Sequence, residues 1–416
     1  MVPSGWCFKK LSELACSSKN SFAIGPFGSD LVMSDYRDEG TPIVFVRDIK
    51  RGAFNWVSNT FVDIEKAKSL KAHSVKAGDI TITKMGLPPG IAAVYPESMP
   101  DGIVTADIIR LRLDTANYDA SFICLLLNSY DVSKQVKLRT AGQTRPKLTL
   151  KDYKSIGVCL PKLDEQRKIA KILSTWDKAI ATTEKLIETS KQQKKALMQQ
   201  LLTGKKRLVN PDTGKAFEGE WEKTHLKPLL VEEKSRNKDN RVTRVLSVTN
   251  HSGFVLPEEQ FSKRVASDNI SNYKVVKKGQ FGYNPSRLNV GSFACLKQFS
   301  EGVLSPMYVV FSTDDTKLQK EYLSYWMQSN EAKQRVKNST QGSVRESVGF
   351  DALCSFPFIL PTLDEQNKVI SVLTAADKKI GVLEAKLAHF KQEKKALMQQ
   401  LLTGKRRVKV DEMEVA

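Results

Sequence analysis

The chain has 416 residues and carries 65 Lys and Arg against 46 Asp and Glu, a formal net charge of +19. With 41% hydrophobic and 27% charged residues it has the composition of a folded globular protein, and at this length two to four domains are expected. There is no apolar run long enough for a membrane span, no pattern of a secretory signal in the first residues, and no cysteine spacing typical of a zinc ribbon or a disulfide framework. We therefore expect reduced thiols and a cytoplasmic location. The positive charge favours a nucleic-acid partner, although an evenly spread charge that keeps the protein soluble would look the same.

Residues 1–158 are predicted to form a first α+β globule. Short β-like runs at 43–47, 80–83 and 103–113 are separated by Gly, Pro and Asn, and a helical stretch follows at 120–136. The basic residues that could contact DNA are Arg47 at the end of a β-run, Lys84 in the loop after the next run, and Arg145 in the sequence Thr140-x-Gly142-x-x-Arg145. Gly142 could equally mark a simple turn.

Residues 159–207 are predicted to form a helical spacer, and 359–407 repeat it at an offset of 200 residues. Between 160–205 and 360–405, 26 of the 46 positions are identical, and the last twelve match without a break, so the chain is a tandem duplication. Asp164 and Asp364 are expected to cap the helix starts, and Gly204 and Gly404 to end the helices. Each helix would have 39 residues and be about 58 Å long.

Both helices carry apolar residues at alternating intervals of three and four, which is the pattern of a coiled-coil seam. Pairing of the two helices with each other, in antiparallel directions, is preferred over two unrelated amphipathic helices that pack on separate domains. The predicted seam and partner interface comprises Leu173, Ile180, Ile187, Leu197, Leu201, Leu373, Ile380, Leu383, Leu387, Leu397 and Leu401. The fold predicted is two α+β globules separated by an antiparallel helix pair, with a pseudo-two-fold internal repeat.

Residues 208–358 are predicted to form the second globule, followed after the second spacer by a short tail at 408–416. Its β-like runs lie at 244–248 and 303–311 and its helical stretch at 320–336. Asn284, Arg287 and Asn289 lie in one loop and carry the amide and guanidinium groups that suit base edges, and Arg345 repeats the position of Arg145. An ordinary polar surface loop would have the same composition.

Motifs for chemistry are missing. The sequence contains no P-loop, no dinucleotide-binding glycine pattern and no paired histidines for a metal, so we expect no catalytic residues, no metal site and no cofactor in this chain. A stand-alone DNA methyltransferase or nuclease is disfavoured for that reason. A coiled-coil scaffold without DNA would explain the helices, but neither the charge nor the two diverged globules.

Taken together, the residues resemble the DNA-specificity subunit of Type I restriction–modification systems. The marks are L-P-x-L-x-E-Q at 160–166 and 360–366, each opening a helix that ends in L-L-T-G-K, and Y-N-P-S-R-x-N-V-G-S at 283–292. The resemblance implies that each globule is a target recognition domain reading one half of an asymmetric, bipartite sequence in double-stranded DNA, with the helix pair setting the spacer. It also implies two adenine-N6 methyltransferase subunits and a restriction–translocase subunit as partners, which would supply the S-adenosylmethionine, ATP and Mg²⁺ chemistry.

Overall fold

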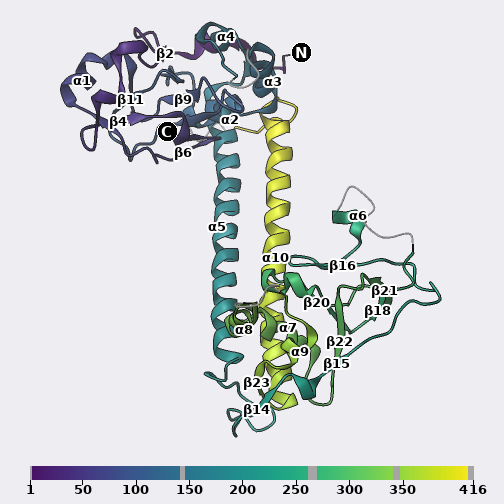
Figure 1. Cartoon of the computed structure of the whole chain (residues 1–416). Coiled ribbons are helices and arrows are strands. Elements are labelled where there is room, and N and C mark those ends of the chain that lie inside the picture. The colour runs from purple at the N-terminus through teal and green to yellow at the C-terminus, as the bar shows by residue number, and fades with distance from the viewer. Residues whose placement is uncertain (1, 141–145, 261–268, 341–346, 411–416) are drawn as a thin grey trace. The chain divides into compact units, whose positions relative to one another are not determined.

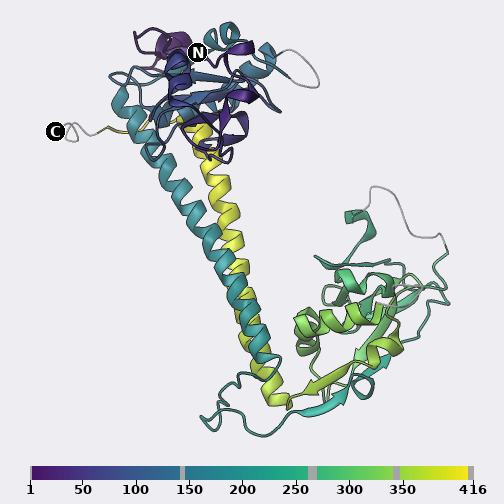
Figure 2. The same ribbon diagram turned by 60° about the vertical axis from the view of Figure 1, so that its left-hand side comes forward.

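The structure is a computed structural model that describes residues 2–140, 146–260, 269–340 and 347–410 (Figures 1 and 2). The chain divides into two compact units. Unit 1 comprises residues 1–184 and 386–416, and unit 2 comprises residues 185–385. Two long helices, α5 (Leu163–Leu201) and α10 (Leu363–Leu401), are each shared between the units. Each unit therefore contains one globule, the adjoining part of one long helix and a part of the other.

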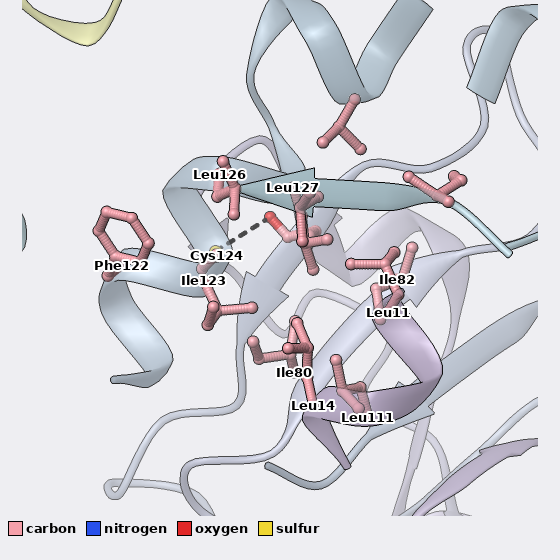
Figure 3. Close-up of a cluster of buried hydrophobic side chains, with 14 of the residues drawn as sticks. Leu11, Leu14, Ile80, Ile82, Leu111, Phe122, Ile123, Cys124, Leu126 and Leu127 are labelled. Atoms are coloured by element: carbon pink, nitrogen blue, oxygen red, sulfur yellow. Dashed lines mark hydrogen bonds between the residues drawn. The ribbon is translucent and has the colours of Figure 1, made fainter. Parts of the chain in front are cut away.

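The globule of unit 1 is built on a four-stranded antiparallel sheet covered by a helix. The strand order is β10–β9–β12–β2, and α2 (Ala120–Leu127) packs on β10. Apolar side chains of the sheet, of the 3₁₀ segment η1 (Leu11–Leu14) and of α2 fill the space between them (Figure 3). The Cys124 thiol lies within this core and donates to the Ala92 carbonyl at 3.5 Å. The strands of the sheet are β2 (Phe22–Ile24), β9 (Ile80–Thr83), β10 (Ala92–Val94) and β12 (Ile108–Leu111).

A second, five-stranded sheet lies in the same globule, with the order β3–β7–β4–β11–β8. β11 pairs in parallel with β4 and antiparallel with β8. A small hairpin, β5–β6, follows β4 along the chain. The bounds of these elements and of the remaining ones are β1 (Cys7–Lys10), β3 (Tyr36–Arg37), β4 (Thr41–Val44), β5 (Ile49–Lys50), β6 (Ala53–Phe54), β7 (Phe61–Val62), α1 (Ile64–Ser69), β8 (Ser74–Val75), β11 (Gly102–Val104), α3 (Tyr130–Arg139), α4 (Leu150–Lys154) and β13 (Gly157–Leu160).

The globule of unit 2 repeats part of this plan, because the four-stranded sheet recurs whereas the five-stranded sheet is represented by the two-stranded pair β18–β21. Its four-stranded sheet has the order β20–β19–β22–β15, which corresponds strand for strand to β10–β9–β12–β2 of unit 1. The pair β14–β23 likewise corresponds to β1–β13. The elements are β14 (Glu222–His225), β15 (Leu230–Glu232), β16 (Ser247–Thr249), β17 (Gly253–Val255), α6 (Pro257–Gln260), β18 (Lys274–Lys277), β19 (Phe281–Tyr283), β20 (Phe293–Cys295), β21 (Glu301–Leu304), β22 (Val309–Thr313), α7 (Lys320–Gln328), α8 (Asn330–Thr340), α9 (Phe350–Cys354) and β23 (Pro357–Leu360).

Several elements predicted as single runs are broken in the structure. The run 103–113 forms two strands in different sheets, because a turn closed by the Ile108 N–H on the Thr105 carbonyl (3.0 Å) reverses the chain between them. The run 303–311 divides in the same way into β21 and β22. The stretch 120–136 is two helices, because Ser129 caps α3 by accepting from the Val132 N–H at 3.4 Å. Likewise 320–336 divides at Ser329, and the runs 43–47 and 244–248 are strands only in part.

The long helices have the predicted length of 39 residues but begin one residue early, at Leu163 and Leu363. Asp164 and Asp364 therefore lie in the first turn and are not the caps, since the Gln166 N–H already bonds the Lys162 carbonyl at 3.1 Å. A carboxylate in the first turn still stabilises the positive end of the helix dipole. Both helices end as predicted, with Gly204 and Gly404 in the left-handed conformation (φ 69° and 68°).

Within each unit the two long helices pack side by side in opposite directions (Figures 1 and 2). In unit 1, Asp177 pairs with Lys394 and Glu184 with Lys391, so the residue number rises along one helix as it falls along the other. In unit 2, Asp377 pairs with Lys194 (2.6 Å) and Glu384 with Lys191 (2.7 Å), which are the same contacts shifted by 200 residues.

The apolar contacts between the helices are less symmetric than the ion pairs. All eleven seam residues named from the sequence are buried or half-buried. Trp176 and Phe390 meet edge to face at 5.5 Å in unit 1. In unit 2 the equivalent positions are Ala376 and Ser190. There a tyrosine of α7 adds polar contacts to both helices, since the Tyr325 hydroxyl donates to Asp377 at 2.9 Å and the Lys194 ammonium lies 5.2 Å from the centre of its ring. Across residues 2–140, 146–260, 269–340 and 347–410, no helix is long and apolar enough to cross a bilayer.

Candidate nucleic-acid interface

The repeated Glu-Gln pair at the start of each long helix ties the helices to the globule. In unit 1 the Glu165 carboxylate, which is buried, accepts two bonds from the Arg407 guanidinium, both at 2.7 Å. The Gln166 side chain accepts from the Asp119 N–H (3.0 Å) and donates to the Asn117 carbonyl (3.2 Å). The globule and the ends of both helices are therefore fixed to one another by two adjacent side chains.

Unit 2 contains the same clamp. Arg207 donates to both oxygens of the buried Glu365 carboxylate, at 2.6 and 2.7 Å, and the Trp221 indole adds a third donor at 2.8 Å. Gln366 accepts from the Gln319 N–H at 2.8 Å. The sequence motifs included these glutamates, but no such role was predicted for them. The signal was present, because the Glu, the Gln and the Arg after each helix all occur in both copies.

Arg47 is exposed and lies between β4 and the β5–β6 hairpin of unit 1. Its Nε donates to the Ser58 hydroxyl at 2.8 Å, and its guanidinium carbon lies 4.7 Å from the centre of the Phe45 ring. The hairpin itself is anchored at its tip, where Arg51 donates to the Asn128 carbonyl at 2.5 Å and the Gly52 N–H to the Ala92 carbonyl at 2.9 Å. Arg47 is thus presented from a supported loop.

Lys84 is half-buried and is partly engaged with its own globule. Its ammonium lies 3.4 Å from the Ala106 carbonyl and 4.8 Å from the centre of the Phe27 ring. The attraction between a lysine ammonium and the face of an aromatic ring restricts the motion of the side chain. Arg47 and Lys84 come from different segments of unit 1, so they do not form one loop as the candidates of unit 2 do.

Three of the four candidates of unit 2 lie in one segment between β19 and β20, where Asn284 directly precedes the 3₁₀ turn η7 (Pro285–Val290) and Arg287 and Asn289 lie within it. Asn284 caps this turn, because its side-chain oxygen accepts from the Ser286 N–H at 3.1 Å. Arg287 and Asn289 are exposed. Asn289 also lines a cavity of about 570 Å³ together with Lys297 and Lys333. Asn284 therefore shapes the loop, while Arg287 and Asn289 remain accessible to a ligand.

Arg145 and Arg345, predicted as phosphate or base contacts, lie outside the described residues. Over 2–140, 146–260, 269–340 and 347–410, no group of three His, Cys, Asp or Glu side chains is placed to hold a metal ion. The candidate residues that the structure describes are thus arginine, lysine and amide groups on loops, and groups of these types suit the edges and the phosphates of a nucleic acid.

Two α+β globules share the strand order of their four-stranded sheets, each carries candidate basic residues on loops, and each is tied to the long helices by a Glu–Arg clamp. A family model, the Type I restriction modification DNA specificity domain, matches residues 3–192 and 235–392. The chain belongs to this family, and its function is DNA sequence specificity within a Type I restriction–modification complex. In this family the specificity subunit is not the catalytic one.

Relatives extend over most of the chain. It is 26% identical to the Type I restriction enzyme MjaVIII specificity subunit of Methanocaldococcus jannaschii over 324 residues, which cover 74% of this chain and 75% of that protein. The putative MjaX specificity subunit of the same organism is 24% identical over 436 residues and covers 98% and 95%. These matches confirm the resemblance identified from the sequence motifs.

Solved structures share the fold. The HsdS subunit of Thermoanaerobacter tengcongensis superposes with a TM-score of 0.53 at 16% identity, covering 97% of this chain and 98% of that one. The Type I S subunit of M. genitalium gives a TM-score of 0.55 at 12% identity, covering 97% and 99%. A chain from a study of complex assembly and conformational transition in a type I R-M system gives 0.56 at 15% identity, covering 98% and 100%.

Proposed function

We propose that each globule reads one half of an asymmetric, bipartite target in double-stranded DNA. The observation that carries this proposal is the combination of one strand order with two different loops. At corresponding places between β9 and β10 and between β19 and β20, unit 1 has Lys84-Met85-Gly86 and unit 2 has Pro285-Ser286-Arg287. Since base edges are distinguished by the side chains that reach them, different loops on the same scaffold favour two different half-sites.

The helix pair is proposed to set the number of unread base pairs between the half-sites. Support comes from the two uninterrupted helices of 39 residues and from ion pairs that recur 200 residues apart. An insertion of seven residues in each helix adds about 11 Å and keeps the seam in register. This insertion is expected to change the spacer and leave both half-sites intact. An unchanged spacer would refute the ruler.

We also propose that this chain binds two adenine-N6 methyltransferase subunits and a restriction–translocase subunit, and that the assembly acts in the cytoplasm. In unit 1 a groove of about 1370 Å³ runs between α3, the start of the chain and the last turns of α10, and Lys391, Lys395 and Lys405 contribute to its walls. Such a groove could receive part of a partner. S-adenosylmethionine, ATP and Mg²⁺ would be bound by the partners, and this chain would bind none of them.

The test is a genome-wide map of N6-methyladenine in cells that contain the partner subunits and either the wild-type chain or Arg287→Ala. The wild-type map is expected to show one split, asymmetric motif, and the variant to relax the second half-site while the first is unchanged. Arg241→Ala is the matched control, because it removes an exposed arginine, paired with Glu301 at 3.2 Å, from the same globule. Equal relaxation of both half-sites, or the same effect from the control, would contradict the assignment of Arg287.

A further inference from the structure

Behind the exposed Arg47 lies a carboxylate that no solvent reaches. Asp48 is fully buried (0% exposed), although it belongs to a surface loop. Its two oxygens accept from the Phe45 N–H (2.8 Å), the Val57 N–H (3.0 Å), and the N–H and hydroxyl of Ser58 (3.0 and 2.7 Å). A buried carboxylate is tolerated when its lone pairs are satisfied in this way, and it then fixes the geometry of the groups around it.

The direction of the hydrogen bonds follows from the chemistry of the partners. Asp48, as a carboxylate, can only accept, so the Ser58 hydroxyl donates its single proton to it. The hydroxyl oxygen is then left as an acceptor, and the Arg47 Nε–H donates to it at 2.8 Å. A relay thus runs from the buried Asp48 through Ser58 to Arg47.

The relay holds the guanidinium at Nε while the Phe45 ring supports it from one face at 4.7 Å. Phe45 itself packs edge to face against Tyr36 at 5.8 Å, so this support is part of the globule. No ion pair within the described part of the chain involves Arg47, and its side chain is exposed. Among the described residues, no hydrogen bond or ion pair engages the terminal NH1 and NH2 groups, so they are available to a ligand.

We infer that Asp48 and Ser58 are positioning residues that present the terminal guanidinium fork of Arg47 to DNA in the first half-site. The fork suits a pair of acceptors in one plane, and DNA offers these as the O6 and N7 atoms of a guanine or as two oxygens of a phosphate diester. Orientation before binding reduces the entropy that is lost on contact. This inference rests on the proposed function, since it assumes that the globule of unit 1 reads DNA.

A simple counter-charge does not explain the arrangement. An arginine that only neutralised Asp48 would be expected to bond it directly, as Arg407 bonds Glu165 in the same unit. The corresponding hairpin of unit 2, β16–β17, has Thr249 and Asn250 before its turn, and the Thr249 hydroxyl donates locally to the Gly253 carbonyl at 3.3 Å. The relay is therefore a feature of the first globule, in line with two different half-sites.

The test uses the full chain assembled with its partner subunits, and it measures methylation of a DNA library in which every position of the first half-site is varied. If the fork binds guanine, Arg47→Ala and Arg47→Lys should each lose about 5- to 150-fold of the discrimination at one base pair. If the fork binds phosphate, Arg47→Ala should weaken binding to all sequences alike. It should also reduce the slope of log affinity against log salt concentration by about one. Either result supports the inference, and they identify which acceptor is used.

Ser58→Ala tests the relay itself, because it removes the hydroxyl and leaves the charge of Arg47 in place. It should shift recognition in the same direction as Arg47→Ala but by less, and Ser58→Thr, which retains a hydroxyl, should restore it. Arg37→Ala is the matched control, since Arg37 is an exposed arginine of the same unit, paired with Asp63 at 2.9 Å. Thermal unfolding of each variant verifies that the globule is intact.

The inference is overturned if Arg47→Ala behaves like Arg37→Ala, or if Ser58→Ala and Ser58→Thr have the same effect. Failure of the proposed function has a different signature. In that case the wild-type complex would show no preference at any position of the first half-site, and no variant could change it. If every Arg47 variant leaves both the base preference and the affinity of the wild-type complex unchanged, the relay alone is refuted.

Discussion

Replacing Arg207 by alanine should destabilise unit 2 strongly, because it leaves the Glu365 carboxylate buried without a cation. The Glu365 side chain is 2% exposed and Arg207 is 24% exposed, and their two bonds measure 2.6 and 2.7 Å. Breaking a buried ion pair from one side costs about 3–5 kcal/mol. The lower end applies here, since Arg207 is partly hydrated and the Trp221 indole still donates to the carboxylate at 2.8 Å. For a unit of this size, a loss of about 3 kcal/mol lowers the melting temperature by roughly 6–12 °C.

Calorimetry of the full chain measures the effect. Lys206→Ala is the control, because it removes an exposed charge from the adjacent position and should shift the transition only slightly. Replacing both partners, as in Arg207→Met with Glu365→Leu, should recover much of the loss, since no buried charge then lacks a partner. If Arg207→Ala melts within error of Lys206→Ala, the clamp does not stabilise the unit and the reasoning is wrong.

Three further predictions follow from the duplicated architecture and from the core. Gly404→Ala should destabilise the protein more than Gly204→Ala. Both glycines have positive φ, but an added Cβ would lie 2.6 Å from a carbon of Pro3 at Gly404 and 3.5 Å from a carbon of Trp221 at Gly204. Chemical denaturation of the two variants measures the difference in their free energies of unfolding. Tyr325→Phe, which removes a hydroxyl bonded to α10, should cost about 1–2 kcal/mol and should increase hydrogen exchange in the part of α10 in unit 2. Burial raises the pKa of Cys124 to about 12, so at pH 8 almost no reactive thiolate forms, and mass spectrometry after brief alkylation should find the exposed Cys7 modified and Cys124 intact.

The sequence alone was sufficient for the duplication and for the long helices. Their ends were placed within one residue, because Gly204 and Gly404 act locally and the seam repeats over many turns. Local signals were insufficient where the chain reverses inside an apolar run. At the turn, the Thr105 hydroxyl donates a hydrogen bond to the Val44 carbonyl at 3.0 Å, and Val44 lies 61 residues earlier in the chain.

The candidate interface was harder to predict than the fold, for the same reason. Glu165 and its partner Arg407 are 242 residues apart, so the recurrence of both residues in the two copies did not show that they pair with each other. The contacts of Arg47 with Ser58 and Phe45 arise only when the loop closes on the buried Asp48. Its position at the end of a β-run identified Arg47 as a candidate for DNA contact, but the hydrogen bond of its guanidinium depends on Ser58, which lies 11 residues further along the chain.

Two copies of a single helix sequence are sufficient to form all the ion pairs described between the long helices. Asp177 and Lys194 belong to α5, and their partners Lys394 and Asp377 occupy the equivalent positions of α10. A chain with a single globule and a single helix would thus already carry both members of every such pair, and two copies of it could associate through them. Gene duplication and fusion would then have required no new polar contact. Once the two halves were in one polypeptide, mutations in one globule no longer changed the other, and the two surfaces could evolve separately.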